Sequence, residues 1–217
     1  MPKAESKTKT SKPTKEKFTT EAYGVITLQA SHKEIRKLKK SADAPSIHGT
    51  KLWGSSYMLM DYLQKNPPSK KEKILELGCG WGVAGIHCAK HYKANVTGVD
   101  ADPAVFPYLR LFAEYNNVSI EEKVAYFEKL SAKYLGSFDT IIAADICFWD
   151  ELGETVYKLI KRAIKGGTKR IIMADPGRPP FTDMAEKCVE KYYAEFLDYD
   201  VSKPKKATGY LLVIENA

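Results

Sequence analysis

The sequence lacks several features that would place it outside the ordinary globular proteins. Its 217 residues contain no apolar run near the ~20 residues that a membrane-spanning helix needs. The four cysteines, Cys79, Cys88, Cys147 and Cys188, form no CxxC pair and are too few for a disulfide framework at this length. Residues 1–17 have no apolar segment of the kind found in secretory signals. We therefore expect no membrane association, reduced thiols and a cytoplasmic location.

Acidic residues are scarce only in the first part of the chain. Residues 1–40 hold 11 of the 34 Lys and Arg residues but 4 of the 27 acidic ones, so they carry the whole net charge of +7. We predict a basic N-terminal arm over residues 1–40, disordered over 1–17, followed by one neutral domain over 41–217. The arm either attracts an acidic protein partner or is a solvated tail. Because the domain itself is neutral, the charge distribution does not favour a nucleic-acid partner.

Helical and strand patterns alternate from residue 73 onward, which indicates βαβ units and a mostly parallel, doubly wound sheet. In such α/β sheets, ligands bind beyond the carboxyl ends of the strands. We predict strands at residues 73–77, 95–99, 124–127, 137–144, 169–174 and 210–215, and helices at residues 32–40, 52–63, 83–91, 103–116, 153–164 and 183–196.

A glycine-rich loop follows the strand at 73–77 and admits two interpretations. Gly80, Gly82 and Gly85 fit the spacing of a dinucleotide-binding loop, with Asp100 placed to hold a ribose hydroxyl. In such a site, however, the first glycine directly follows the strand, and Gly80 comes several residues later. An NAD-dependent dehydrogenase is therefore a weaker hypothesis, and no His/Lys or Ser/Tyr/Lys set supports it.

The alternative frame starts at the strand end with Glu76 and continues through Gly78, Gly80 and Gly82. A carboxylate at this position suits the cationic amino-acid end of S-adenosylmethionine, whereas it would repel a pyrophosphate. Asp100 serves the ribose in this interpretation as well. The frame resembles motif I of the class I methyltransferases that use this cofactor.

The strand at 137–144 leads into Asp145, Phe148 and Trp149. Asp145 could accept a hydrogen bond from an amine, and the two rings could hold an ammonium group by cation–π attraction. The alternative is an aspartate that caps a helix, followed by core aromatics. His87 and His91, four residues apart with Cys88 between them, could form a metal pair, but no third ligand is evident, and we favour a partly exposed helix face.

Together these motifs resemble a family. Trp53 before the glycine loop, the stretches ELGCGWG, VTGVD and DICF, and their order are similar to the seven-β-strand protein methyltransferases of the methyltransferase-16 type, many of which methylate lysine side chains. The segment Asp175-Pro-Gly-Arg178 resembles the branch of the electron-transfer-flavoprotein β-subunit lysine methyltransferases. The resemblance covers residues 45–217. Two departures are the missing acidic residue at the end of the third strand, where Glu128 is nearest, and the basic arm.

The resemblance implies a Rossmann-like seven-stranded sheet with an antiparallel C-terminal strand and S-adenosyl-L-methionine as cofactor. It implies a protein substrate and direct transfer of methyl to a lysine amine, and the residues themselves lead us to expect no metal. The site residues that we carry over are Trp53, Glu76, Gly78, Gly80, Gly82, Asp100 and Asp145 for the cofactor, Asp145 and Phe148 for catalysis, and Trp149 and Arg178 for the substrate.

Some roles and alternatives stay open at this point. Trp53 is either a lid over the cofactor or a core anchor, and Arg178 either clamps a substrate carboxylate or supports the site through a salt bridge. Asp145 is better suited to position an amine than to act as a strong base. Other hypotheses are a small-molecule N- or O-methyltransferase and a non-catalytic partner subunit. A nucleobase methyltransferase is disfavoured because DICF replaces the Pro-Pro motif of those enzymes.

Overall fold

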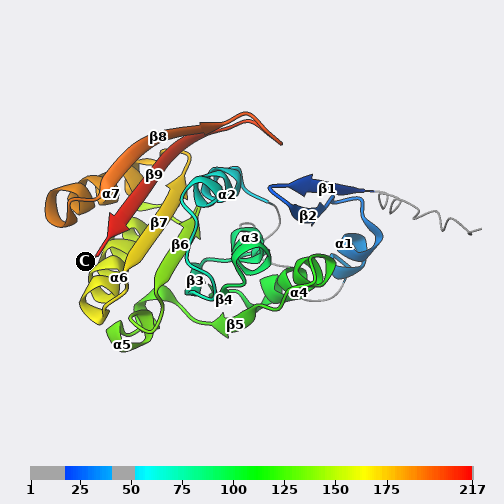
Figure 1. Cartoon of the computed structure of the whole chain (residues 1–217), viewed down its shortest axis with the longest axis horizontal. Helices are drawn as coiled ribbons and strands as arrows, with labels where there is room; N and C mark the ends of the chain where they lie inside the picture. The colour runs from blue at the N-terminus through cyan, green and yellow to red at the C-terminus, as the bar shows by residue number, and fades with distance from the viewer. Residues whose placement is uncertain (1–17, 41–51, 217) are drawn as a thin grey trace, which may run out of the picture.

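The computed structural model describes residues 18–40 and 52–216 (Figure 1). Two short strands, β1 (Thr19–Ala22) and β2 (Val25–Leu28), precede helix α1 (Lys33–Leu38). The sheet strands are β3 (Lys73–Leu77), β4 (Asn95–Asp100), β5 (Glu121–Val124), β6 (Thr140–Ala144), β7 (Arg170–Asp175), β8 (Glu195–Val201) and β9 (Ala207–Glu215). The further helices are α2 (Ser55–Lys65), α3 (Val83–Tyr92), α4 (Phe106–Tyr115), α5 (Ala132–Leu135), α6 (Asp150–Gly166) and α7 (Pro179–Tyr192).

The large sheet has seven strands in the order β5-β4-β3-β6-β7-β9-β8. Its first five strands are parallel, and β9 runs antiparallel to both β7 and β8. The order reverses between β3 and β6, which places a crevice at the carboxyl ends of these two strands. This arrangement confirms the predicted Rossmann-like, doubly wound, mostly parallel sheet with an antiparallel C-terminal strand.

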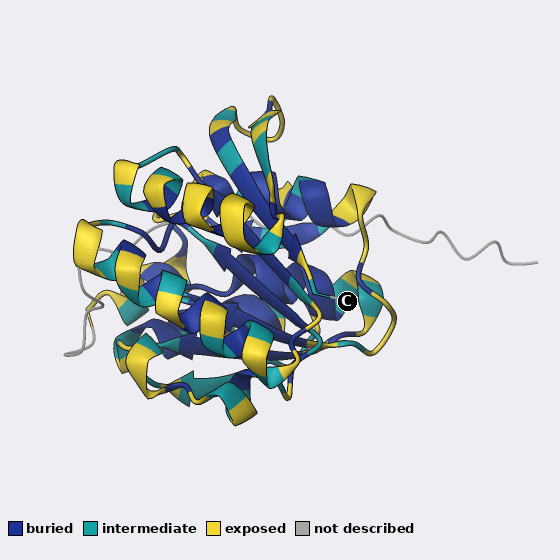
Figure 2. Cartoon of the chain, turned by 90° about the vertical axis from the view of Figure 1, so that its left-hand side faces the viewer, coloured by how far each residue is buried: buried dark blue, intermediate teal, exposed yellow. Residues whose placement is uncertain are grey.

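Alternate residues of the strands supply two hydrophobic cores, one on each face of the sheet. Ile74, Val96 and Ile142 pack with α2, α3 and α4, whereas Leu75 and Ile141 pack with the helices α5, α6 and α7. This alternation follows from the strand period of two residues. Buried residues accordingly fill the centre of the molecule, and the outer turns of the helices are exposed (Figure 2).

Local signals explain where the helices around the site begin and end. Helix α6 has two acidic residues, Asp150 and Glu151, in its first turn, and its C-terminus is capped by Gly167, which has a left-handed φ of 97°. Helix α7 begins with Pro179 and Pro180, whose fixed φ suits the first turn. The segments before these two helices are therefore held in place directly beyond β6 and β7.

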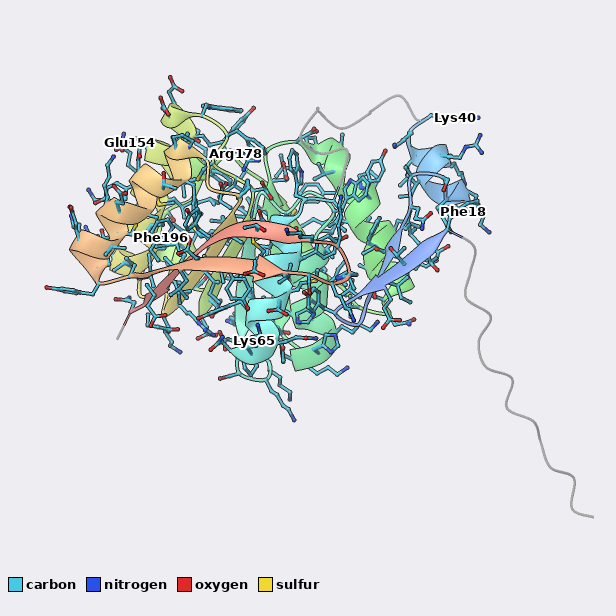
Figure 3. The ribbon with its side chains drawn as sticks, turned by 90° about the horizontal axis from the view of Figure 1, so that it is seen from above. Phe18, Lys40, Lys65, Glu154, Arg178 and Phe196 are labelled. Atoms are coloured by element: carbon cyan, nitrogen blue, oxygen red, sulfur yellow. The ribbon has the colours of Figure 1, made fainter. Side chains whose placement is uncertain are left out.

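The N-terminal segment requires a correction of the predicted arm. Residues 18–40 do not extend away from the domain, because they pack on α3 and α4, and Val25 and Ile35 are fully buried in the core between them. Figure 3 shows Phe18 and Lys40 at the end of the molecule away from Glu154. The physical reason is that β1, β2 and α1 carry an apolar face, although four of the six residues of α1 are charged. The predicted disorder of residues 1–17 lies outside the described residues.

The two histidines of α3 bind the turn of this hairpin. His87 Nδ1 and His91 Nε2 lie 3.1 and 2.9 Å from the carbonyl oxygen of Tyr23. His87 is fully buried rather than partly exposed, and burial together with the nearby His91 lowers the pKa of His87 to about 4. Within the described part of the chain, no group of three or more metal-binding side chains occurs.

Several predicted elements have other bounds in the structure, and some elements were not predicted. The third sheet strand is β5 at Glu121–Val124 rather than 124–127, because this edge strand is polar and gives no apolar pattern. The predicted helix at 183–196 ends at Tyr192, where Tyr193 takes a left-handed φ of 54°, and Glu195 begins β8. The hairpin of β1 and β2 was not predicted. No helix within residues 18–40 and 52–216 is both long and apolar enough to span a bilayer.

Candidate active site

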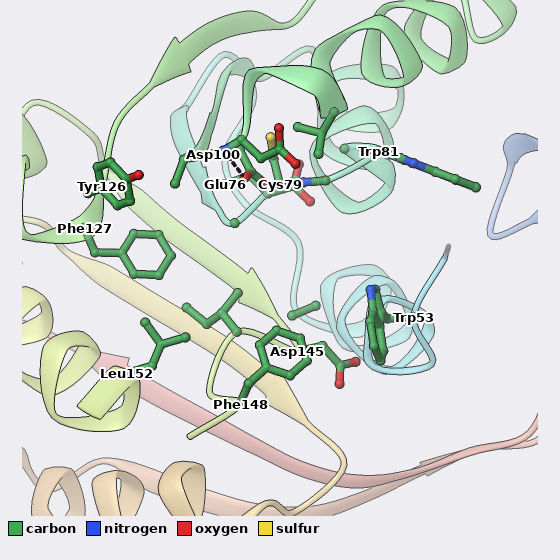
Figure 4. A pocket seen from close by; sticks show the side chains of 18 of the residues that line it. Trp53, Glu76, Cys79, Trp81, Asp100, Tyr126, Phe127, Asp145, Phe148 and Leu152 are labelled. Atoms are coloured by element: carbon green, nitrogen blue, oxygen red, sulfur yellow. Dashed lines mark hydrogen bonds between the residues drawn. The ribbon is translucent and has the colours of Figure 1, made fainter. Parts of the chain in front are cut away.

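A cavity of about 450 Å³ lies at the carboxyl ends of β3, β4 and β6 (Figure 4). Its wall is formed by the glycine loop, by the segments that follow β4, β5 and β6, and by the residues just before α2. The lining includes most of the predicted site residues, namely Trp53, Glu76, Gly78, Gly80, Gly82, Asp100, Asp145, Phe148 and Trp149. Arg178 is the predicted site residue that is not part of this wall.

The glycines of the loop adopt backbone conformations that other residues rarely take. Gly78, Gly80 and Gly82 have φ values of 57°, 51° and 68°. A Cβ atom at Gly82 would lie 2.2 Å from Leu109 Cδ1, so a side chain there would collide with α4. A Cβ atom at Gly80 would meet nothing within 4 Å. Gly80 therefore leaves open space in the cavity, where a ligand can approach the backbone.

Glu76 lies at the end of β3, with 5% of its surface exposed. Its Oε2 atom accepts the backbone N–H of Gly85 at 3.1 Å, across the start of α3. Burial raises the pKa of Glu76 to about 8, and the Gly85 hydrogen bond opposes this shift. A cationic ligand group beside Glu76 would favour its carboxylate form.

Asp100 ends β4 and fixes the glycine loop from the neighbouring strand. Its Oδ2 accepts the N–H of Gly80 at 3.0 Å, and its Oδ1 accepts the N–H of Asp102 at 3.0 Å. Burial raises the pKa of Asp100, and these two hydrogen bonds oppose the shift. A carboxylate has about four acceptor sites, so Asp100 retains the capacity to hold ligand hydroxyls.

Asp145 follows β6 and is 4% exposed. Its φ of 59° is left-handed, a conformation that aspartate and asparagine tolerate better than most residues. Its Oδ2 accepts the N–H of Ser55, at the start of α2, over 3.3 Å, and its Oδ1 lies 2.8 Å from Arg178 Nη1. Asp145 therefore does not cap the helix that follows it, since α6 begins at Asp150 and no side chain caps it.

Aromatic rings surround Asp145 at the mouth of the cavity. The rings of Trp53 and Phe148 lie 5.5 Å apart in an edge-to-face arrangement, and Figure 4 shows Asp145 close to both. Trp149 lies 6.0 Å from Phe148 and is 50% exposed. Trp53 is half-buried and lines the cavity, so its side chain is part of the site rather than a core anchor.

Arg178 forms ion pairs with two carboxylates of the protein. Its Nη1 atom lies 2.8 Å from Asp145 and 2.8 Å from Asp175. Of the two roles left open by the sequence, this geometry favours support of the site over a clamp for a substrate carboxylate.

Several lining residues were not predicted from the sequence. They lie at or after the ends of the strands β3 to β6, just before α2, or in the first two turns of α2, α3 and α6: Leu52, Ser56, Cys79, Trp81, Val83, Ala101, Asp102, Val105, Ala125, Tyr126, Phe127, Ala144, Ile146, Glu151, Leu152 and Thr155. Glu128, the acidic residue nearest to the end of the third strand, also lines the cavity. The lining residues that follow β4 and β5 could have been identified in the sequence, because each comes directly after the end of a strand.

The fold is that of the class I methyltransferases. A tRNA (uracil-54, C5)-methyltransferase from Pyrococcus abyssi, solved with S-adenosyl-L-homocysteine, matches 73% of this chain and 37% of its own, with a TM-score of 0.52 and 25% identity. A ribosomal protein L11 methylase from Lactobacillus delbrueckii subsp. bulgaricus matches 81% of this chain and 83% of its own, with a TM-score of 0.57 and 14% identity.

The chain belongs to the lysine methyltransferase family, whose pattern matches residues 32–189. Its relatives include the electron transfer flavoprotein beta subunit lysine methyltransferases of Xenopus laevis, 26% identical over 73% of this chain, and of Rattus norvegicus, 24% identical over 70%. The chain spans 63% and 58% of the length of these two relatives. The family match begins at residue 32, within the segment that we predicted as an arm.

The comparisons identify S-adenosylmethionine as the cofactor, and the cavity fits it. The open space at Gly80 can admit the ligand, and within residues 18–40 and 52–216 no cationic side chain pairs with the buried acid Glu76. Glu76 would hold the ammonium group and Asp100 the ribose hydroxyls, as the sequence predicts. The wall from Ala125 to Glu128 would face the adenine, since it follows the neighbouring strand β5.

Proposed function

We propose that this chain is an S-adenosylmethionine-dependent methyltransferase that acts on the side-chain amine of a lysine in a protein. The observation that carries the proposal is the position of Asp145. This buried carboxylate lies in the cofactor cavity, at a mouth built from Trp53, Phe148 and Trp149. The family match and the named lysine methyltransferase relatives support the same conclusion.

The arrangement suits an amine better than other acceptors. Asp145 Oδ2 can accept an N–H of the incoming amine and so orient its lone pair into the cavity. The half-exposed Trp149 and the exposed Tyr126 leave the mouth open to solvent, as a lysine on a protein surface requires. A long apolar stem can pack on the rings while its nitrogen reaches the carboxylate.

The bound cofactor supplies a methyl group that is already activated by its sulfonium. The protein therefore contributes mainly alignment, which can be worth about 7–11 kcal/mol through effective molarity. The lysine, whose reference pKa is about 10.4, must first lose its proton, and water at the open mouth can accept it. Asp145 is bound to Arg178 through Oδ1, so we assign it the role of positioning the amine rather than deprotonating it.

The test is methyl transfer from S-adenosylmethionine carrying a deuterated methyl group. The first acceptor is the recombinant electron transfer flavoprotein β subunit, the substrate named for the relatives, and the second is a cell lysate. We expect mass spectrometry to locate the label on lysine side-chain nitrogen. Label on glutamine, on a carboxyl group or only on small molecules would contradict the lysine assignment.

The variant that isolates Asp145 is Asp145→Asn. Asparagine tolerates the left-handed backbone of this position, so the change removes the charge without adding the strain that alanine would bring. We expect turnover to fall far more than S-adenosylhomocysteine affinity. Asp150→Asn is the matched control, because Asp150 is an exposed acid in the first turn of α6. Equal losses of turnover and affinity in Asp145→Asn would remove its proposed role.

A further inference from the structure

An ionic cluster lies directly behind Asp145. Arg178 Nη1 is 2.8 Å from Asp145 Oδ1 and 2.8 Å from Asp175 Oδ2, so one guanidinium is shared by two carboxylates. The side chains of Asp145 and Asp175 are 3% and 1% exposed, and that of Arg178 is 23% exposed. The three residues come from the ends of β6 and β7 and from the start of α7. They place a net charge of −1 behind the mouth of the cavity.

Asp175 fixes Arg178 in this position. Its Oδ1 atom accepts the backbone N–H groups of Gly177 and Arg178 at 3.0 and 2.9 Å, while Oδ2 holds the guanidinium. Movement of Arg178 out of the cluster would leave two buried carboxylates without a counter-charge, which is strongly unfavourable. Arg178 is therefore a fixed part of the site rather than a gate that moves aside for the substrate.

Arg178 also packs on the aromatic rings of the mouth. Its guanidinium carbon lies 4.7 Å from the ring centre of Phe148 and 5.8 Å from that of Trp53. The protein's own cation thus interacts with the two rings nearest to Asp145. A single side chain contacts the carboxylate and the two aromatic groups that we assign to the acceptor amine.

We propose that Arg178, anchored by Asp175, is a positioning residue for the acceptor amine. This inference rests on the proposed function. Arg178 binds Oδ1 of Asp145, so the amine N–H goes to Oδ2, which accepts it at its second lone pair beside the N–H of Ser55. It also fixes the ring of Phe148 beside the path of the lysine stem. Because Asp175 holds the same cation, the ion pair sets the orientation of the Asp145 carboxyl group before the substrate arrives.

Steady-state kinetics with the electron transfer flavoprotein β subunit as acceptor tests the positioning role. We expect Arg178→Met to lower kcat by about 10- to 100-fold, because small displacements of aligned groups have effects of this size. KM and the S-adenosylhomocysteine Kd should change by less than about threefold, a split that a general loss of structure would not give. Arg178→Lys should recover part of kcat, and Asp175→Asn should lower it.

The matched control is Arg170→Met. Arg170 lies at the opposite end of β7, where it pairs with Glu215 at 2.8 Å, and is similarly shielded, with 15% of its side chain exposed. We expect Arg170→Met to keep the wild-type kcat. An Arg178→Met variant that keeps wild-type kcat would overturn this inference alone. A wild-type chain that transfers no methyl group to a protein would overturn the proposed function and, with it, this role of Arg178.

A second measurement does not depend on turnover. In Arg178→Met, Asp145 and Asp175 face each other without a cation, while the buried Cys147 nearby stays neutral because burial raises its pKa to about 12. The folded state should then bind a proton that the unfolded chain releases near pH ~4. Its melting temperature should fall, relative to wild type, as pH rises from 4 to 7, and adding Asp175→Asn should reduce that slope. Parallel pH profiles for wild type and Arg178→Met would contradict the shared ion pair.

Discussion

The pH dependence of ligand binding tests the role of Glu76. Burial raises the pKa of Glu76 to about 8, so at pH 6 its carboxyl group is largely neutral in the free protein. A ligand ammonium group beside it lowers this pKa, because an opposite charge favours the ionised form. Binding of S-adenosylhomocysteine therefore releases a proton, and its affinity should increase as the pH rises toward 8.

The size of the effect follows from the ionised fraction. For a pKa near 8, this fraction increases about 20-fold between pH ~6 and pH ~7.5, which corresponds to about 2 kcal/mol of binding free energy. The association constant should increase by up to that factor. Calorimetric titration in two buffers of different ionisation enthalpy measures both the affinity and the number of protons released.

Two controls separate the contribution of Glu76 from that of Asp100. The ligand 5′-methylthioadenosine keeps the ribose that we assign to Asp100 but lacks the amino-acid end, so its affinity should lack the Glu76 contribution. Glu76→Gln keeps a hydrogen-bond acceptor for Gly85 and removes the charge. It should weaken S-adenosylhomocysteine binding and flatten its pH profile. The same slope for both ligands, or an unchanged slope in Glu76→Gln, would refute the assignment.

Four further predictions concern the cavity and the fold. Gly82→Ala should lower the free energy of unfolding by about 2–4 kcal/mol in chemical denaturation, because its Cβ would lie 2.2 Å from a side-chain atom of α4. Gly80→Arg should cost about 1 kcal/mol and abolish S-adenosylhomocysteine binding, whereas retained affinity would exclude Gly80 from the ligand path. Ile35→Ala should lower the free energy of unfolding by about 2–5 kcal/mol, and no loss would mean that α1 is not part of the cooperative fold. The pKa of His87 is lowered to about 4, so the free energy of unfolding should fall by about 1–3 kcal/mol as the pH falls from about 6.5 toward 4. His87→Asn should remove this pH dependence.

Much of the cofactor side was predictable because its signals are local in the sequence. Glu76 and Asp100 each end a strand, and the glycines between them have a spacing that only a tight loop after a strand explains. Parallel strands bring such ends to one edge, so the contact between Asp100 and Gly80 could be expected. The left-handed φ of Asp145 had no such signal, since it follows from the turn that leads from β6 toward α6.

The ion pair that holds Asp145 on the substrate side of the cavity could not be predicted, because it joins segments that are distant in the sequence. Asp145 and Arg178 lie 33 positions apart, and the sequence left two roles for Arg178 open. The contribution of residues 18–40 to the core was missed for a different reason. The prediction took the charge of residues 1–40 as a whole, whereas residues 18–40 contain only four lysines and supply the apolar residues that pack, such as Val25 and Ile35.

The most direct test of the central claim is calorimetric titration of the purified chain with S-adenosylhomocysteine, with NAD as the parallel ligand. The structure places Glu76, Gly80 and Asp100 in one cavity, and we predict that one equivalent of S-adenosylhomocysteine binds there with micromolar affinity while NAD does not bind. Binding of NAD alone would mean that the glycine loop holds a pyrophosphate, and the assignment of the cavity and of the methyl acceptor would both be wrong.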